Sequence, residues 1–501
     1  MNARLTHTEL KHWEQTLRTT LSREETLEMI VPDACPDILD IVQTQAAPEL
    51  RCRECTAGAV ELGGRVRCAI LYRPEGEERL ERLRAELPVK VTAELEAATE
   101  QSQCLLTTRL ALAETRAINP RKVLIRVVLS LELSLYAPAV LSCAAELEQR
   151  EELGIEVRRS TVFGTFLRGV VQRPFTCTET VQLPGSRASM EELLWTSGRA
   201  FDTEARLVGE KLIFKGGSLI HLLYRTEEGS LSTAEFELPF SQIAEVGETE
   251  EGASFQLDIQ LVALQARPCA PEGRGVELEL ELLAQLLVRE RRELSCLTDA
   301  YALRGRGEPA FTVCPVPELV DQGTLRQRAR ELLEAPEPLS ELCELRCAPL
   351  QTRLMGAELC TQVRVAALCL TKSGTYCALN RTLQLTCPVT VPEQAQCQAA
   401  CSVPTADASV TEEGLELRLE AEFSYLVTRQ QRLRCLSAFT LEEAQEEAEG
   451  PSIVLRKLGP EESLWDVAKA CRTTVSEIEQ ANDLAGESAA AGQMLLIPRR
   501  R

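Results

Sequence analysis

The fold class is decided by the stretch Val123-Leu124-Ile125-Arg126-Val127-Val128-Leu129-Ser130-Leu131-Glu132-Leu133-Ser134-Leu135, in which Val, Ile or Leu occupies every second position. A period of two places these apolar residues on one face of a strand and the residues between them on the other. A helix would scatter the same residues around its whole circumference. The stretch therefore predicts a long β-strand with one buried face.

Two later stretches alternate in the same way. Residues 276–282 place glutamate between Val or Leu, and residues 415–427 give a third run of apolar residues at every second position. One apolar face per strand indicates antiparallel sheets that pack on one side only. Strands of such length also predict bends or bulges. We therefore expect a mainly β protein built from antiparallel, sandwich-like domains.

The chain also contains an internal repeat. A stretch that ends in Leu-Tyr-Arg at 71–73 matches one that ends in Leu-Tyr-Arg at 223–225, and residues 362–371 give a weaker third copy. A second landmark follows each copy: Glu-Leu-Pro-Val at 86–89, Glu-Leu-Pro-Phe at 237–240 and Thr-Cys-Pro-Val at 386–389. The intervals are 152 residues, from Tyr72 to Tyr224, and 146 residues, from Tyr224 to Leu370. Such regular spacing predicts three copies of one structural unit.

Each copy begins with a segment that has helix-like spacing. These segments are residues 36–42, 189–195 and 338–345. Proline can occupy a first helical turn without losing a hydrogen bond, and Ser189 is a suitable N-cap. Extended segments that end at a proline, 25–32 and 179–184, precede the first two. We expect a short helix before the sheet in each copy, and an entry strand before that helix in the first two.

The last fifty residues have a different pattern. Ser463 can cap a helix that buries Leu464, Val467 and Ala468, and Thr473 or Thr474 can cap a second helix. Residues 453–458 and 494–497 predict two flanking strands. The resulting βααβ order resembles a LysM domain, a module best known for binding the N-acetylglucosamine backbone of peptidoglycan.

Composition narrows the classes of partner. The chain has 501 residues and a net charge of −21, so nucleic acid and anionic membrane surfaces are poor partners. The chain contains no run of 18 apolar residues, so we expect no transmembrane helix. Its first residues do not resemble a secretion signal. We expect a cytoplasmic location, which conflicts with a partner in the cell wall.

The 20 cysteines do not predict a metal site or a cofactor. Cys52 and Cys55 form a C-x-x-C pair, but no second pair stands at the spacing of a zinc ribbon. We expect most cysteines to be small buried apolar groups in a reducing compartment. The alternative is disulfides that form late, in an assembled shell.

No catalytic signature is found, and no catalytic residues are predicted. The chain lacks a G-x-x-x-x-G-K-[ST] phosphate loop and an H-E-x-x-H helix, and its three histidines offer no good base. Paired glutamates are plentiful, but spacing alone cannot place two carboxylates across a pocket. A cell-wall hydrolase with a LysM targeting tail remains the enzymatic alternative.

The repeated features resemble the SPOCS domain of endospore-forming bacteria, and three such copies followed by a LysM domain resemble the SipL-type spore-coat morphogenesis proteins. The predicted domains are 1–155, with an N-terminal helical segment, 156–305 and 306–441, which is the most divergent. An acidic linker at 442–451 and a LysM-like domain at 452–501 follow. The linker predicts either a hinge or an extension of the third domain.

The turn after the first LysM strand departs from the family. Glu461 stands at the usual glycine and Glu462 at the usual aspartate, and a bulky side chain should hinder the close approach of a sugar. We therefore expect the module to bind a protein, with Trp465 as anchor. The predicted partner-binding surface consists of Ile453, Lys457, Glu461, Glu462, Trp465, Lys469 and Asn482.

The resemblance implies a non-enzymatic scaffold or adaptor for spore-coat assembly in the mother-cell cytoplasm, at the forespore surface. In such proteins the LysM domain binds the spore-coat morphogenetic ATPase, and the β domains would bind other coat components. A peptidoglycan-binding protein is the second reading, disfavoured by the glutamates in the turn and by the expected location.

Overall fold

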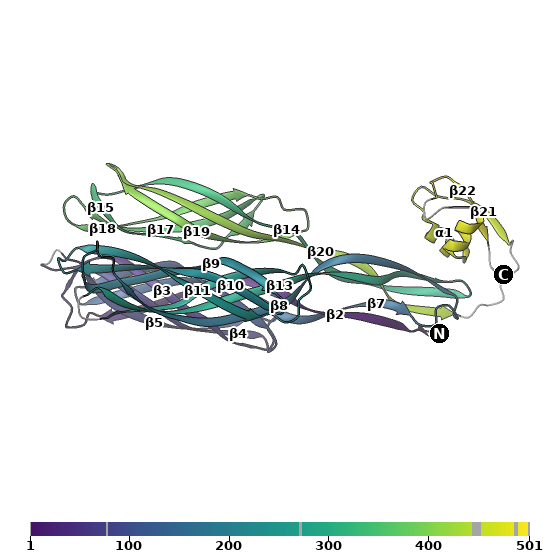
Figure 1. Ribbon diagram of the computed structural model, residues 1–501, viewed down its shortest axis with the longest axis horizontal. Helices are drawn as coiled ribbons and strands as arrows, with labels where there is room; N and C mark the ends of the chain where they lie inside the picture. Colours follow the sequence, from purple (N-terminus) through teal and green to yellow (C-terminus); the bar gives the residue numbers. More distant parts are fainter. Residues whose placement is uncertain (1, 77–78, 270–272, 443–451, 485–488, 499–501) are drawn as a thin grey trace.

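Three long antiparallel strand pairs run through the body of the molecule. The computed structural model describes residues 2–76, 79–269, 273–442, 452–484 and 489–498. The pairs are β2 (Leu5–Ile30) with β7 (Lys122–Leu147), β8 (Ile155–Gln182) with β13 (Gly275–Ala302), and β14 (Arg306–Glu334) with β20 (Gly414–Glu442). These strands are 26 to 29 residues long. Figure 1 shows them running from three lobes into one narrow stalk.

One half of each long pair belongs to a lobe. In the first lobe, β3 (Ile38–Thr56), β4 (Ala59–Pro74) and β5 (Glu81–Glu94) form a three-stranded sheet. This sheet packs on β2, β7 and β6 (Gln103–Asn119), and the apolar residues of the alternating run at 123–135 are fully buried between the two layers. The mainly β, antiparallel fold class is therefore confirmed.

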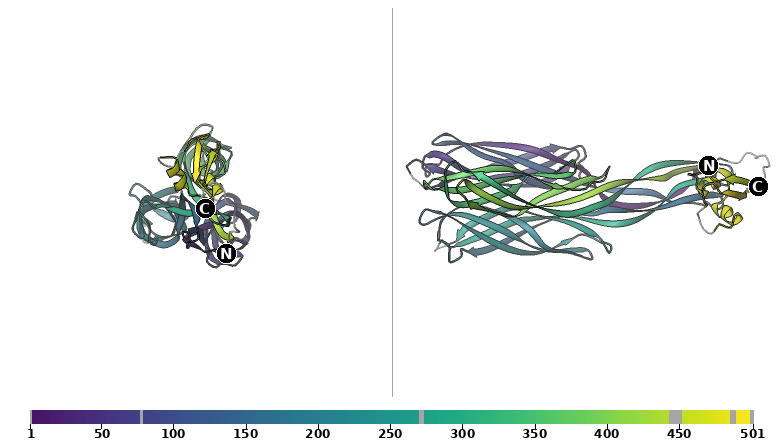
Figure 2. Two further views of the ribbon diagram at one scale, coloured as in Figure 1. Left: turned by 90° about the vertical axis from the view of Figure 1, so that its right-hand side faces the viewer. Right: turned by 90° about the horizontal axis from the view of Figure 1, so that it is seen from above.

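The other two lobes repeat this arrangement, and the end-on view in Figure 2 shows all three around a common axis. The second lobe adds β9 (Met190–Val208), β10 (Lys211–Thr226), β11 (Leu231–Glu245) and β12 (Ser254–Cys269) to its long pair. The third adds β15 (Leu339–Pro349), β16 (Arg353–Met355), β17 (Glu358–Thr371), β18 (Tyr376–Pro388) and β19 (Gln396–Val410).

The stalk consists of the remaining halves of the three pairs, and a short strand, β1 (Asn2–Ala3), pairs with the end of β20. All three pairs contribute to one apolar core: Leu141, Cys143, Phe166, Leu294, Cys296, Cys314, Val316 and Cys435. The Sγ atoms of Cys296 and Cys435 lie 3.5 Å apart. Burial raises the pKa of the Cys143 thiol to about 11, so this group stays protonated at neutral pH.

The repeated Leu-Tyr-Arg motif has a structural role. Tyr72 and Tyr224 are fully buried, and their hydroxyls donate to the carbonyls of Pro36 and Ala188, each at 3.2 Å. The neighbouring arginine pairs with an acidic residue on the preceding strand, as Arg73 does with Asp40 at 2.8 Å. The motif thus fastens the first two strands of a lobe sheet to each other.

The predicted helices at 36–42, 189–195 and 338–345 are wrong, including the N-terminal helical segment of the first domain. All three segments begin strands, namely β3, β9 and β15. Each of these strands contains register shifts close to its start, for example between Leu339 and Glu341 and between Leu342 and Glu344. A bulge inserts one residue, so inward positions recur at three residues and imitate a helix.

Candidate partner-binding module

The C-terminal module folds as β21 (Ile453–Lys457), α1 (Leu464–Cys471), α2 (Val475–Ala481) and β22 (Met494–Pro498). The βααβ order is therefore confirmed. Ser463 caps α1 and forms a capping box with Asp466, whose pKa is lowered by the hydrogen bonds from Ser463. Thr474 caps α2 in the same way with Glu477.

Two of the predicted site residues stabilise the module itself. The carboxylate of Glu462 pairs with Arg456 and accepts the amide of Gly459 at 3.2 Å, which closes the turn after β21. The side-chain amide of Asn482 donates to the carbonyls of Ile478 and Leu496 and accepts from the amide of Leu496. Their polar groups are therefore already engaged, whereas Glu461 is exposed.

Trp465 and Lys469 meet the stalk of the same chain. The indole Nε1 of Trp465 donates to Asp299 at 2.8 Å, and the ammonium of Lys469 lies 2.7 Å and 2.8 Å from the two oxygens of that carboxylate. The ring of Tyr301 meets the Trp465 ring edge to face, with centroids 4.8 Å apart. The Tyr301 hydroxyl donates to the carbonyl of Thr473 at 2.7 Å. The face that carries Trp465 thus docks on the end of β13.

The sequence contained no signal for this docking contact. Asp299 lies 166 residues from Trp465 along the chain, beside a register shift between Leu297 and Asp299. From the sequence alone, Tyr301 looks like one more apolar residue of a strand. In the structure it is buried with Leu303 in the core of the module. Burial raises the pKa of the Tyr301 hydroxyl, so this group remains a hydrogen-bond donor.

An apolar surface covers the outer face of the two-stranded sheet. Ile453 and Leu455 of β21 are 61% and 64% exposed, and Met494 and Leu496 of β22 are 56% and 41% exposed. Leu455 lies directly opposite Leu496, and Lys457 lies opposite Met494. We call Ile453, Leu455, Met494 and Leu496 the sheet face. These exposed fractions hold while the module is docked on the stalk.

The structure thus separates the seven predicted residues into groups. Ile453 and Lys457 share the outer face of the sheet, whereas Trp465 and Lys469 face the stalk. Sequence reasoning missed Leu455, Met494 and Leu496, although the period of two from Ile453 to Lys457 indicated Leu455. The run Met494-Leu495-Leu496-Ile497 is apolar throughout, so its exposed side could not be distinguished.

Replacing Asp299 with alanine is expected to loosen the docked module. The change removes the acceptor of both Trp465 and Lys469, and charge-assisted hydrogen bonds contribute about 1.5–3 kcal/mol each. Amide hydrogen exchange in α1 should therefore accelerate roughly tenfold or more. Asp407→Ala, which removes an exposed carboxylate on β19, is the matched control and should change nothing in α1. Unchanged exchange in Asp299→Ala would mean that other contacts hold the module.

Parts of the predicted tail lie outside the described residues. These are residues 443–451 of the acidic linker, residues 485–488 of the segment before β22, and the terminal arginines at 499–501. Glu442 is the last residue of β20. Within the described part of the chain, no helix has the length and apolar character needed to cross a membrane.

Comparison with protein families identifies two regions. Residues 189–267 match the family described as SipL, SPOCS domain, and residues 458–498 match the LysM domain family. The first match covers β9, β10, β11 and nearly all of β12, and the second begins at the residue after β21 and extends to the end of β22. No curated protein and no solved structure matches the chain.

The predicted combination of a SipL-type SPOCS domain with a C-terminal LysM domain is therefore confirmed. Both matched families are non-catalytic. Together the two domains support a sporulation-related scaffold that carries a LysM module.

Proposed function

We propose that the chain is a non-enzymatic scaffold for spore-coat assembly, and that its LysM module docks on a protein partner, the spore-coat morphogenetic ATPase. The proposal includes a location in the mother-cell cytoplasm, at the forespore surface. The observation that carries it is the sheet face, where four aliphatic side chains between 41% and 64% exposed gather on a small module.

The chemistry of the sheet face favours a polypeptide over a glycan. Sugars offer many hydroxyl groups, which need hydrogen-bond partners when they are desolvated. Leu455 and Leu496 offer none, and their burial against an apolar protein surface would stabilise a complex by about 25 cal/mol per Å² of apolar area. The turn where LysM domains receive sugars carries Glu461 and an already paired Glu462. Both features support a protein partner.

The docked position of the module also supports binding of a protein partner. Because the sheet face is exposed while Trp465 and Lys469 contact the stalk, a partner can bind without first detaching the module. The three lobes then stay at a fixed orientation to the partner surface. Further weak contacts from the lobes would add through high local concentration on a polymerised partner.

The test is co-purification of the ATPase with the full chain and with a chain that ends at residue 450. We expect capture by the full chain only, and we expect the shortened chain to leave the forespore surface in sporulating cells. Sedimentation with purified peptidoglycan is run in parallel at physiological salt. Retention on the glycan with no capture of the ATPase would overturn the proposal in favour of wall binding.

A further inference from the structure

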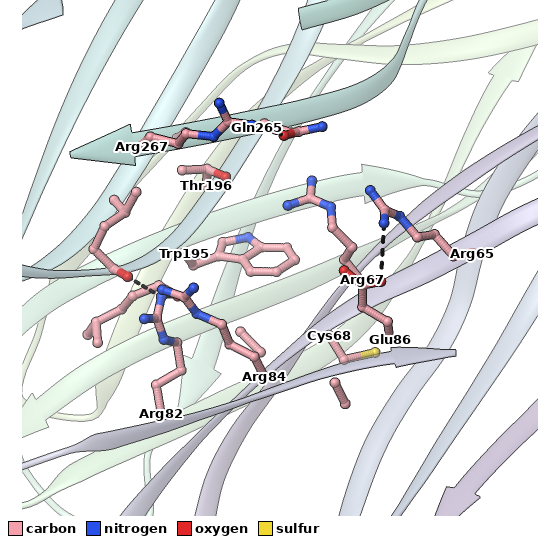
Figure 3. Close-up of a pocket in the computed structure, with 15 residues that line it drawn as sticks. Arg65, Arg67, Cys68, Arg82, Arg84, Glu86, Trp195, Thr196, Gln265 and Arg267 are labelled. Carbon is pink, nitrogen blue, oxygen red and sulfur yellow. Dashed lines mark hydrogen bonds and ion pairs between the residues drawn. The ribbon is translucent and has the colours of Figure 1, made fainter. Parts of the chain in front are cut away.

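A cavity of about 470 Å³ lies between the first and second lobes. Its lining comes from β4 and β5 of the first lobe and from β9 and β12 of the second. Five of the lining side chains are arginines: Arg65, Arg67, Arg82, Arg84 and Arg267. These arginines come from β4, β5 and β12, and Figure 3 shows Arg67, Arg82 and Arg84 around the indole ring of Trp195. Such a concentration of positive charge stands out in a chain with a net charge of −21.

Part of this charge is not balanced by carboxylates. Arg65 and Arg67 share Glu49, Arg65 also pairs with Glu86, a carboxylate in the cavity lining, and Arg82 pairs with Glu192. Arg84 and Arg267, in contrast, form no ion pair with any residue that the structure describes, and Arg267 donates only to the side-chain oxygen of Gln265 at 3.0 Å. At least two guanidinium groups are therefore available to an anion.

Two buried donors in the cavity wall have no acceptor. Trp195 is only 6% exposed, and its Nε1 finds no hydrogen-bond partner among the described residues. The same holds for Nε of Arg82, whose side chain is 8% exposed. Buried polar groups are almost always hydrogen-bonded, because an unsatisfied one costs about 1–3 kcal/mol. Two such donors in one wall indicate a missing acceptor.

The pKa of Arg82 is also consistent with a missing anion in the cavity. Burial lowers its pKa to about 10, Glu192 opposes the shift, and the like charges of Arg84 and Arg225 lower it further. The charged form of Arg82 is thus disfavoured chiefly by burial and further by the nearby charge of Arg84, so an anion placed beside these two groups would stabilise it.

We propose that this cavity binds a small molecule with two or more phosphate groups. Guanidinium groups bind phosphate through paired, charge-assisted hydrogen bonds. A phosphate presents three or more oxygens in different directions, so it can meet an arginine fork and a lone indole N–H together, which a planar carboxylate does less well. The cavity has the size of a ligand site of 300–1,000 Å³. Because the lining comes from two lobes, the bound anion would also bridge them.

A neighbouring cavity of about 380 Å³ shares Arg65 and Gln265 with this one. It contains Glu49 and Glu281, and Arg51 pairs with Glu281. Its positive charge is therefore largely balanced within the protein, and the proposal is confined to the first cavity.

The test is isothermal titration of the full-length protein with inorganic pyrophosphate and with tripolyphosphate at about 0.15 M ionic strength. We expect saturable binding of one molecule per chain, with a change in tryptophan fluorescence. Arg84→Gln combined with Arg267→Gln should weaken binding at least about tenfold, since two charge-assisted contacts are lost. Trp195→Phe should also weaken binding by removing the indole N–H. Arg381→Gln changes an exposed arginine on β18 outside the cavity and should have no effect.

The proposal is overturned if neither pyrophosphate nor tripolyphosphate binds. It is also overturned if the double variant binds them as tightly as the wild-type protein does. Tighter binding of citrate than of pyrophosphate would overturn the phosphate class, and so would capture of an oligoglutamate peptide that pyrophosphate does not displace. The thermal unfolding temperature of each variant shows that the loss is not caused by misfolding. None of these measurements involves the partner of the LysM module. Their outcome therefore tests the anion site independently of the proposed scaffold function.

Discussion

Replacing Leu455 and Leu496 together with aspartate is expected to abolish capture of the protein partner while the chain stays folded. The two side chains lie opposite each other on the sheet face and point away from the module core. Full burial of a leucine at an interface contributes about 1.5–3 kcal/mol, so the loss of both corresponds to roughly a hundredfold weaker binding or more. Co-purification and a binding titration with the purified ATPase, the partner proposed above, measure the loss of binding.

Exposed leucines elsewhere provide the matched control. Leu39 on β3 and Leu332 on β14 are 55% and 41% exposed, close to the values on the sheet face. Leu39→Asp with Leu332→Asp adds the same two charges to the lobes and should leave capture intact. Wild-type affinity in the Leu455 and Leu496 variant, with the module still protected from hydrogen exchange, would place the partner surface elsewhere.

Gly64→Ala is expected to unfold the first lobe or to destabilise it by more than about 3 kcal/mol, at the high end for overpacked sites. A Cβ at this position would overlap the backbone carbonyl of Glu49 and lie 2.9 Å from Cα of Leu50 on the paired strand. Backbone atoms of a sheet cannot move aside as the end of a flexible side chain can. The strain is therefore relieved only by breaking the pairing of β3 with β4. Amide exchange in β3, β4 and β5 reports the loss.

The second lobe offers an internal repetition of this experiment. Gly216 precedes Tyr224 by the same interval at which Gly64 precedes Tyr72, and a Cβ there would overlap the carbonyl of Phe201. Gly216→Ala should destabilise the second lobe comparably. Gly185→Ala is the control, because nothing lies within 4 Å of a Cβ at that position. Equal stability of all three variants would contradict the close approach of these strands.

The sequence predicted the lobes better than the stalk. The runs at 123–135 and 276–282 show apolar residues at every second position because one sheet face packs on a single core, and the residues at those alternating positions are all buried. Towards the stalk, the pairing of β2 with β7 shifts register between Gln15 and Leu17. The alternation breaks at such a shift. The alternating pattern therefore does not predict the long extensions, and the sequence predicts residues 25–32 as a short separate strand.

The candidate site was predictable only in part, and for a related reason. Local rules predicted the cap Ser463 and left Thr473 and Thr474 as alternatives for the second, of which Thr474 caps α2, since capping depends on neighbours within three or four residues. The contacts of Trp465 with Asp299 and Tyr301 depend instead on how a distant strand end meets the module. No periodic pattern in the sequence predicts this contact between the end of β13 and the terminal module. The arginine cavity likewise forms from four strands of two lobes and has no local sequence pattern.

The direction of the long strands determines how the molecule responds to mechanical load. The terminal module follows β20 and lies at the far end of the stalk from the lobes (Figure 1). A pull on that module along the long axis acts parallel to β20 and β14, whose hydrogen bonds then resist in shear, many at once. A sideways pull would open the same bonds one after another, like a zipper. The protein is therefore expected to resist most strongly a force along its long axis, applied between the lobes and the terminal module.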